Sequence, residues 1–202
     1  MKGSGHSSGE ASAWVQRWSH LVAPGATVLD VACGSGRHLR WFAQQGCRVT
    51  GVDRDEAALA LSQHIAQTVL ADIESGPWPL AGRSFDAVVV TNYLWRELLP
   101  MLVGSMSAGG VLIYETFSAG NESVGKPSNP KFLLQPGELL RAAEGLRVVA
   151  FEEGFASEPD RFVQRLVAVR ERAGEPAPAR YRLERRPGSP GQVKSGDSEE
   201  PA

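Results

Sequence analysis

Three small residues alternate through a short stretch, with Ala32, Gly34 and Gly36 each separated by one residue. Side chains this small let the backbone pass close to a ligand. A helical pattern begins near Arg37, and the first amides of a helix favour a negatively charged group lying over them. The spacing therefore predicts a loop that holds a nucleotide or a similar cofactor. A tight turn that binds nothing is the alternative.

Carboxylates lie near the ends of the short apolar runs around this loop. A carboxylate one helix and one strand beyond a glycine loop is placed to accept hydrogen bonds from ribose hydroxyls, which is the role we predict for Asp53. Asp72 is placed to accept a hydrogen bond from the exocyclic amine of an adenine. The three carboxylates and their runs are Asp30 in 28–31, Asp53 in 48–53 and Asp72 in 68–73.

Apolar runs alternate with helical patterns along the chain, which predicts an α/β fold with a mostly parallel sheet. The last two predicted strands are joined by only five residues, 156–160. A parallel pair would need a longer crossover, so this pair is predicted to be antiparallel. The predicted strands are 28–31, 48–53, 68–73, 85–90, 111–116, 146–155 and 161–170.

Helical spacing precedes the first strand and follows the second. The pattern over 11–22 predicts an amphipathic helix that either packs over the sheet or covers a ligand pocket with Trp14 or Trp18. Asp55 is predicted to cap a later helix. The buried stripe of that helix is expected to comprise Ala58, Leu61 and Ile65.

Taken in order, these motifs resemble the class I S-adenosylmethionine-dependent methyltransferases. The resemblance is carried by 28–36, 51–53, 71–73, 85–90 and 109–113, and it covers about residues 11–170. It implies a three-layer Rossmann-like fold, a seven-stranded sheet that ends in an antiparallel hairpin, and S-adenosyl-L-methionine as the cofactor. The cofactor-binding residues that it implies are Asp30, Ala32, Cys33, Gly34, Ser35, Gly36, Asp53, Arg54, Asp72, Ile73, Thr91 and Asn92.

Four residues are candidates for contact with the methyl acceptor. Tyr93 and Arg96 follow the fourth predicted strand at the carboxyl end of the sheet, where doubly wound folds place their ligands. A packed tyrosine and a solvated arginine are the alternatives. His38 is either a partly exposed helix residue or a pocket wall and proton acceptor. Glu115 is either a base or substrate clamp, or a hydrogen-bonded carboxylate at the end of a strand.

The residues after Glu115 form an unusually long connection. Loops as long as 117–135 inside a compact domain are often functional lids, so we predict a lid over the acceptor pocket. Its expected polar contacts are Asn121, Lys126 and Asn129.

Some members of the resembled family carry two prolines after the fourth strand, in a motif that marks methylation of amino nitrogens in bases or amides. This chain has Asn92-Tyr93-Leu94-Trp95 without prolines, which argues against that branch. Residues 30–38, followed by Asn92-Tyr93-Leu94, are instead similar to the small bacterial branch near the tellurite-resistance methyltransferases. That likeness implies a small-molecule acceptor, such as a chalcogen oxyanion or a thiol, methylated by direct in-line displacement.

Two other functions are alternatives. A non-catalytic S-adenosylmethionine-binding or interaction protein would share every cofactor motif. An NAD-dependent oxidoreductase would also use a glycine loop and Asp53. However, it would require glycine where the chain has Leu39, and it offers no role for Asp72.

Composition sets the remaining expectations. A chain of 202 residues with 42% hydrophobic content suits one domain, predicted at 11–170 between a disordered amino terminus, 1–10, and a disordered tail, 171–202. A net charge of -2 gives no footprint for nucleic acid. Two cysteines and the absence of a signal peptide or membrane segment predict a cytoplasmic protein. The scattered histidines predict no metal site. A monomer or weak homodimer is expected.

Overall fold

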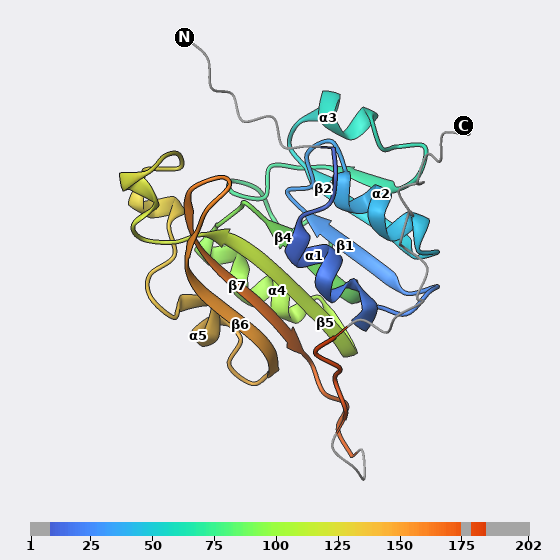
Figure 1. Ribbon diagram of the computed structural model, residues 1–202. Coiled ribbons are helices and arrows are strands. Elements are labelled where there is room, and N and C mark those ends of the chain that lie inside the picture. The colour runs from blue at the N-terminus through green and yellow to red at the C-terminus, as the bar shows by residue number, and fades with distance from the viewer. Residues whose placement is uncertain (1–8, 175–178, 185–202) are drawn as a thin grey trace, which may run out of the picture.

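The computed structural model describes residues 9–174 and 179–184 (Figure 1). The strands are β1 (Thr27–Val31), β2 (Arg48–Asp53), β3 (Gln67–Leu70), β4 (Phe85–Thr91), β5 (Met106–Phe117), β6 (Arg147–Ala156) and β7 (Arg161–Val169). They form one sheet in the order β3-β2-β1-β4-β5-β7-β6. The first five strands run parallel, whereas β7 is antiparallel to both β5 and β6. The predicted α/β fold, including its terminal hairpin, is confirmed.

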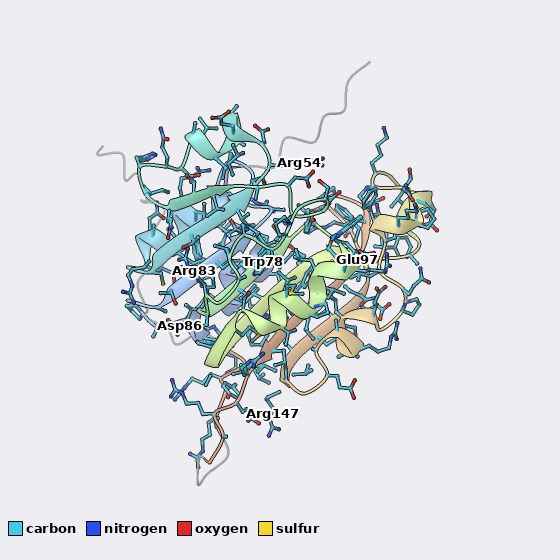
Figure 2. The ribbon with its side chains drawn as sticks, turned by 180° about the vertical axis from the view of Figure 1, so that it is seen from behind. Arg54, Trp78, Arg83, Asp86, Glu97 and Arg147 are labelled. Carbon is cyan, nitrogen blue, oxygen red and sulfur yellow. The ribbon has the colours of Figure 1, made fainter. Side chains whose placement is uncertain are left out.

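Helices cover both faces of this sheet. The face toward the viewer in Figure 1 carries α1 (Ala13–Trp18), the 3-10 turn η1 (Ser19–Leu21) and α2 (Arg37–Gln44). The short helix α3 (Glu56–Ala60) packs against β2. The opposite face carries α4 (Leu99–Gly104) and α5 (Glu138–Ala142), and α4 lies in front of the sheet in Figure 2. Three further 3-10 turns are η2 (Arg96–Leu98), η3 (Asn121–Ser123) and η4 (Pro130–Phe132).

The helix α1 is a packing element of the core. Trp14 and Trp18 are buried, with their ring centroids 5.6 Å apart, in the apolar cluster on the α1 and α2 face of the sheet. The Trp14 indole donates a hydrogen bond to the Leu166 carbonyl of β7 at 3.4 Å. This anchoring fits the packing alternative for the amino-terminal helix and places both tryptophans in the core.

The helix α3 is shorter than its sequence pattern predicts. Asp55 caps it as expected, by accepting a hydrogen bond from the Ala58 amide at 3.0 Å. The helix ends at Ala60, and Leu61 is 60% exposed, so the prediction that Leu61 belongs to a buried stripe is wrong. The chain turns here because the fully buried Ser62 packs against the glycine loop: a Cβ atom built on Gly36 would lie 2.7 Å from the Ser62 Cβ.

Part of the predicted carboxyl-terminal tail lies against the domain. His20 Nε2 is 3.0 Å from the Arg182 carbonyl oxygen, and Tyr181 packs against the apolar cluster around α1. The other tail residues that fall in 175–178 and 185–202, and residues 1–8 of the amino terminus, lie outside the described residues. Within the described part of the chain, none of the helices has the length and apolar character needed to cross a membrane.

Close packing between β2 and the loop after β1 gives a test of this fold. A Cβ atom on Gly51 would lie 2.6 Å from Leu39 Cδ1 and 2.7 Å from Cys33 Sγ. Because both of those side chains are buried, we expect Gly51→Ala to destabilise the protein by about 1–3 kcal/mol in urea denaturation. Gly104→Ala is the matched control, since Gly104 is helical and has nothing within 4 Å of an added Cβ. Equal stability of Gly51→Ala and the wild type would contradict this packing.

Candidate functional site

The loop after β1 adopts the left-handed backbone conformation at alternate residues. The φ angles are 53° at Ala32, 51° at Gly34 and 77° at Gly36. Glycine adopts this conformation freely, whereas an alanine there is strained by about 1–2 kcal/mol. The Cys33 amide donates to the Val52 carbonyl of β2 at 3.1 Å, so the loop is tied to the neighbouring strand.

Asp53 fixes this loop from the end of β2. Its Oδ2 atom accepts a hydrogen bond from the Gly34 amide at 2.7 Å, and its Oδ1 atom accepts one from the Asp55 amide at 3.0 Å. A carboxylate has about four lone-pair positions on its two oxygens. Asp53 therefore keeps acceptor capacity for hydroxyl groups of a ligand while it holds the loop.

A cavity of about 190 Å³ lies between this loop and the segment after β3. Asp72 borders it and accepts hydrogen bonds from the Ser75 hydroxyl at 2.6 Å and the Glu74 amide at 3.0 Å. The Ser75 bond, followed by the Glu74 bond, holds the Asp72 pKa below its ordinary value, so the carboxylate is ionised at neutral pH. The lining residues are Ala32, Asp53, Arg54, Ala71, Asp72, Ile73, Glu74 and Tyr93.

The donor and acceptor groups of this cavity fit a nucleoside. Two carboxylates with spare acceptor capacity suit the hydroxyls of a ribose and the amine of an adenine. Ala71 and Ile73 supply apolar wall on which a flat ring can pack. Six of the predicted residues, five for the cofactor and one for the substrate, meet around this one cavity: Ala32, Asp53, Arg54, Asp72, Ile73 and Tyr93.

Tyr93 is placed to donate a hydrogen bond rather than to act as a base. Its hydroxyl is buried beside the Glu74 carboxylate. Burial, and after it the negative charge of Glu74, raises the Tyr93 pKa far above its ordinary value. The phenol therefore stays protonated. The preceding residue, Asn92, has a left-handed φ of 54°, and its amide donates to the Glu115 carbonyl at 2.9 Å.

His38 is buried, which excludes the alternative that it is a partly exposed helix residue. The Ser12 amide, at the start of α1, donates to His38 Nε2 at 3.3 Å. The other ring nitrogen, Nδ1, lies 3.6 Å from Asp30 Oδ2. The imidazole thus sits between the first strand and α1, and it joins α2 to both.

Glu115 lies in a row of polar side chains on the α1 and α2 face of the sheet. It is buried, and its Oε2 atom accepts a hydrogen bond from Arg165 Nε of β7 at 2.6 Å. Arg161 lies further off, with its Nη2 atom 3.9 Å from the same oxygen. Thr91 accepts a hydrogen bond from Arg37 Nη2 at 3.3 Å.

Arg96 lies apart from the nucleoside cavity and fastens the long loop. Its guanidinium donates to both oxygens of Glu138, at 2.7 and 2.9 Å, and also to the carbonyls of Lys131 and Leu133, at 2.7 and 2.8 Å. These bonds join the segment after β4 to the predicted lid and to α5. Four hydrogen bonds to protein acceptors indicate a structural role for this arginine.

The lid residues are fastened in the same way. Asn121 is buried; its amide nitrogen donates to the Pro127 carbonyl at 3.0 Å, and its oxygen accepts from the Phe162 amide at 3.1 Å. The Asn129 side chain accepts a bond from the Lys131 amide at 3.0 Å. Figure 1 shows 117–135 beside the turn between β6 and β7, at the same end of the sheet.

Sequence reasoning missed Arg161 and Arg165, the arginines beside Glu115. Arg161 and Arg165 are four residues apart on β7, so their side chains lie on the same side of the strand. Val163 and Val167 lie on that side too, and both are buried in the core. Charged residues at inward positions of a strand are the signal that could have revealed them. Arg37 was visible only as the start of a helix. Among the described residues, no group of three or more His, Cys, Asp or Glu residues could hold a metal ion.

Comparison with known proteins identifies the domain. Residues 28–108, from β1 to the beginning of β5, match a family model described as a methyltransferase domain. This stretch is a methyltransferase domain. The chain resembles the class I S-adenosylmethionine-dependent methyltransferases, as the sequence motifs predict.

Relatives of this methyltransferase domain act on different acceptors. Malonyl-[acyl-carrier protein] O-methyltransferase of Serratia marcescens is 32% identical over 107 residues, covering 48% of this chain and 41% of that protein. Ribosomal RNA small subunit methyltransferase H of Gemmatimonas aurantiaca is 30% identical over 163 residues, covering 75% and 49%. The chain thus spans less than half the length of these relatives. The names of the relatives leave the acceptor class open.

The fold of the methyltransferase domain is shared with solved structures. TehB from Haemophilus influenzae superimposes with a TM-score of 0.64 at 19% identity, covering 76% of this chain and 60% of that one. At this identity the likeness concerns the fold alone.

Removing the Arg96 guanidinium should loosen the long loop. In Arg96→Gln, we expect the amides of Ala119 and Leu134, which close the base of the loop, to exchange hydrogen about tenfold faster or more. Hydrogen exchange followed by mass spectrometry measures this. Arg147→Gln is the control, because the Arg147 pair with Glu171 is exposed on another part of the protein (Figure 2). Unchanged protection of the loop in Arg96→Gln would contradict the fastening role.

The same ion pair predicts a pH dependence. Burial raises the Glu138 pKa, but the bonds from Arg96 and the Gln135 amide outweigh it and leave the pKa below its ordinary value. The stabilisation by Glu138 is therefore present above the unfolded pKa of about 4.3 and is lost as pH falls through the folded pKa. We expect Glu138→Gln to be less stable than the wild type by about 1 kcal/mol at neutral pH, because solvent screens the partly exposed pair. Urea denaturation should show this gap closing in acid; a constant gap would contradict it.

Proposed function

We propose that this chain transfers the methyl group of S-adenosylmethionine to a small-molecule nucleophile. The single observation that carries the proposal is the cavity between the left-handed loop and Asp72, with Asp53 at its border. The methyltransferase domain identified at residues 28–108 contains all of these groups. The match and the geometry therefore support the same ligand.

Two groups of residues bind the two ends of the cofactor in this proposal. Asp53 accepts hydrogen bonds from the ribose hydroxyls, and Asp72 accepts one from the adenine amine. Asp30 and Thr91, on β1 and β4, lie toward the methionine end together with the loop residues. The remaining residues of this set are Cys33, Gly34, Ser35, Gly36 and Asn92 in the loops after β1 and β4.

The reacting end needs alignment more than acid or base strength. When bound, the cofactor supplies a sulfonium methyl group that is already activated for displacement by a nucleophile. Holding two reactants in line can contribute about 7–11 kcal/mol toward the barrier. Tyr93 supplies a protonated hydroxyl beside the cavity, and Glu115 supplies a carboxylate oxygen. His38 accepts a hydrogen bond from the Ser12 amide and so joins α2 to the start of α1.

A small-molecule acceptor is part of the proposal. The region matched by the family model stops at residue 108, and the acceptor-facing segment 117–135 is tied down by Arg96 and Asn121. A segment fastened at both ends favours a compact acceptor over a large macromolecular surface. In this proposal, the acceptor atom that attacks the methyl group is determined by residues of this chain outside the matched region.

Binding measurements test the proposed cofactor first. Isothermal titration should show micromolar affinity for S-adenosylmethionine and S-adenosylhomocysteine and no binding of NADH. In Asp53→Asn, we expect both affinities to fall by about 10–100-fold, because a hydrogen bond to a charged group contributes about 1.5–3 kcal/mol. The matched control is Asp86→Asn, since Asp86 lies at the opposite end of the strands from Arg54 of the cavity (Figure 2).

The outcomes separate the alternatives. NADH binding without binding of S-adenosylmethionine would overturn the proposal in favour of an oxidoreductase. Binding of S-adenosylmethionine with no methyl transfer to any small acceptor would favour a non-catalytic cofactor-binding protein. Equal affinities of Asp53→Asn and the wild type would show that the ribose is held elsewhere.

A further inference from the structure

Polar side chains cross the sheet in a row on the α1 and α2 face. Along β5, Val111 and Ile113 face the apolar cluster under α1, and Glu115 lies on the same side of the strand. Glu115 is paired in register with Thr91 of β4 and with Arg165 of β7. These residues stand near the strand ends that border the proposed cofactor site. The row therefore continues from the cofactor side of the sheet toward the terminal hairpin.

At the β5 and β7 end of this row, two polar atoms are buried without a hydrogen-bond partner in the described part of the chain, and Asp30 Oδ2 on β1 is a third. The first two are Oε1 of Glu115, whose side chain is 2% exposed, and Nε of Arg161, whose side chain is 25% exposed. Glu115 uses only its other oxygen, toward Arg165. Buried polar atoms are nearly always hydrogen-bonded in folded proteins, so an unpaired donor and an unpaired acceptor on two side chains whose nearest printed atoms are 3.9 Å apart indicate a binding partner.

The charges of the row do not cancel. Arg37, Arg161 and Arg165 carry three positive charges, and Asp30 and Glu115 carry two negative ones. Adding the exposed pair of Arg17 and Glu152 leaves the net charge at +1. S-adenosylmethionine itself carries a net positive charge. An excess of positive charge on partly buried side chains is unfavourable unless an anion enters, so the site favours a negatively charged acceptor.

We propose that Arg161 binds a carboxylate group of the methyl acceptor, while Glu115 Oε1 accepts a hydrogen bond from an N–H or O–H of the same molecule. This inference rests on the proposed function and names its substrate class. A guanidinium presents a planar fork of donors that matches the two oxygens of a carboxylate. A phosphate dianion would need further donors, and only one arginine in the row makes no hydrogen bond to the described residues. A single carboxylate satisfies Arg161 and lowers the excess charge.

A matched set of acids and amides tests the carboxylate. The full protein, saturated with S-adenosylhomocysteine, is heated in the presence of small monocarboxylates, each compared with its primary amide at equal ionic strength. We expect the carboxylates to raise the melting temperature more than the amides, by about 3 °C at ten times the dissociation constant. Arg161→Gln should remove the difference. Arg147→Gln should keep it, because Arg147 pairs with Glu171 and lies in register with Val169, beyond Arg165 on β7.

A second variant guards against a folding defect. Arg161→Lys keeps a positive charge near Glu115 and should retain part of the preference for carboxylates. Equal shifts by acids and amides in the wild type, or a preference that persists in Arg161→Gln, would overturn the inference. Isothermal titration with S-adenosylhomocysteine separates the two proposals. Cofactor binding without a carboxylate preference sinks this inference alone, whereas absence of cofactor binding sinks the proposed function as well.

Discussion

The hydrogen bond from the Gly34 amide to Asp53 Oδ2, at 2.7 Å, is the contact on which the cofactor end of this protein depends. It joins the loop after β1 to the last residue of β2, and parallel pairing is what brings those two points together. The loop can reach Asp53 only because its backbone turns through left-handed conformations. At Ala32 that turn is made without glycine, so the contacts around the loop must hold a strained residue.

The polar row on the same sheet depends on a different constraint, which is that buried charges must be balanced. Arg165 lies between Glu115, at 2.6 Å, and the partly exposed Glu152, at 3.1 Å. Its guanidinium also lies 5.9 Å from the ring centre of Trp14 in α1. One arginine thereby links two strands and the packing helix, and it leaves Arg161 with weaker partners. Arg165 therefore has a structural role, whereas Arg161 is the residue that we propose binds the acceptor.

The fold was largely predictable because its signals are local. The parallel strands β1, β2 and β4 are short apolar runs, and a link as short as 156–160 permits only an antiparallel pair. Helix lengths were less predictable. The apolar spacing continues past Ala60, but the chain stops the helix where Ser62 meets Gly36, and that contact is set by the tertiary structure.

The position of a single side chain at the site was predictable only where the residue stands at the end of a predicted strand. Asp53 and Asp72 follow from strand ends, and both border the cavity. His38 and Arg96 have residue types suited to catalysis, yet each is committed to distant partners: Ser12 for the histidine, and Glu138 with two carbonyls for the arginine. Neither set of partners could be inferred from spacing, because the residues are 26 and 42 positions apart.

The cofactor half and the proposed acceptor half of the site are built from different parts of the chain. The cofactor half is built from consecutive elements, from β1 to the segment after β3, and lies wholly inside the region that matches a methyltransferase domain. The other half combines Glu115 with Arg161 and Arg165 of the terminal hairpin, all outside that region. The match to the family model supports the first half and does not extend to the second. In our proposal the acceptor is recognised outside the region matched by the family model, by the charge and the unpaired atoms of β5 and β7.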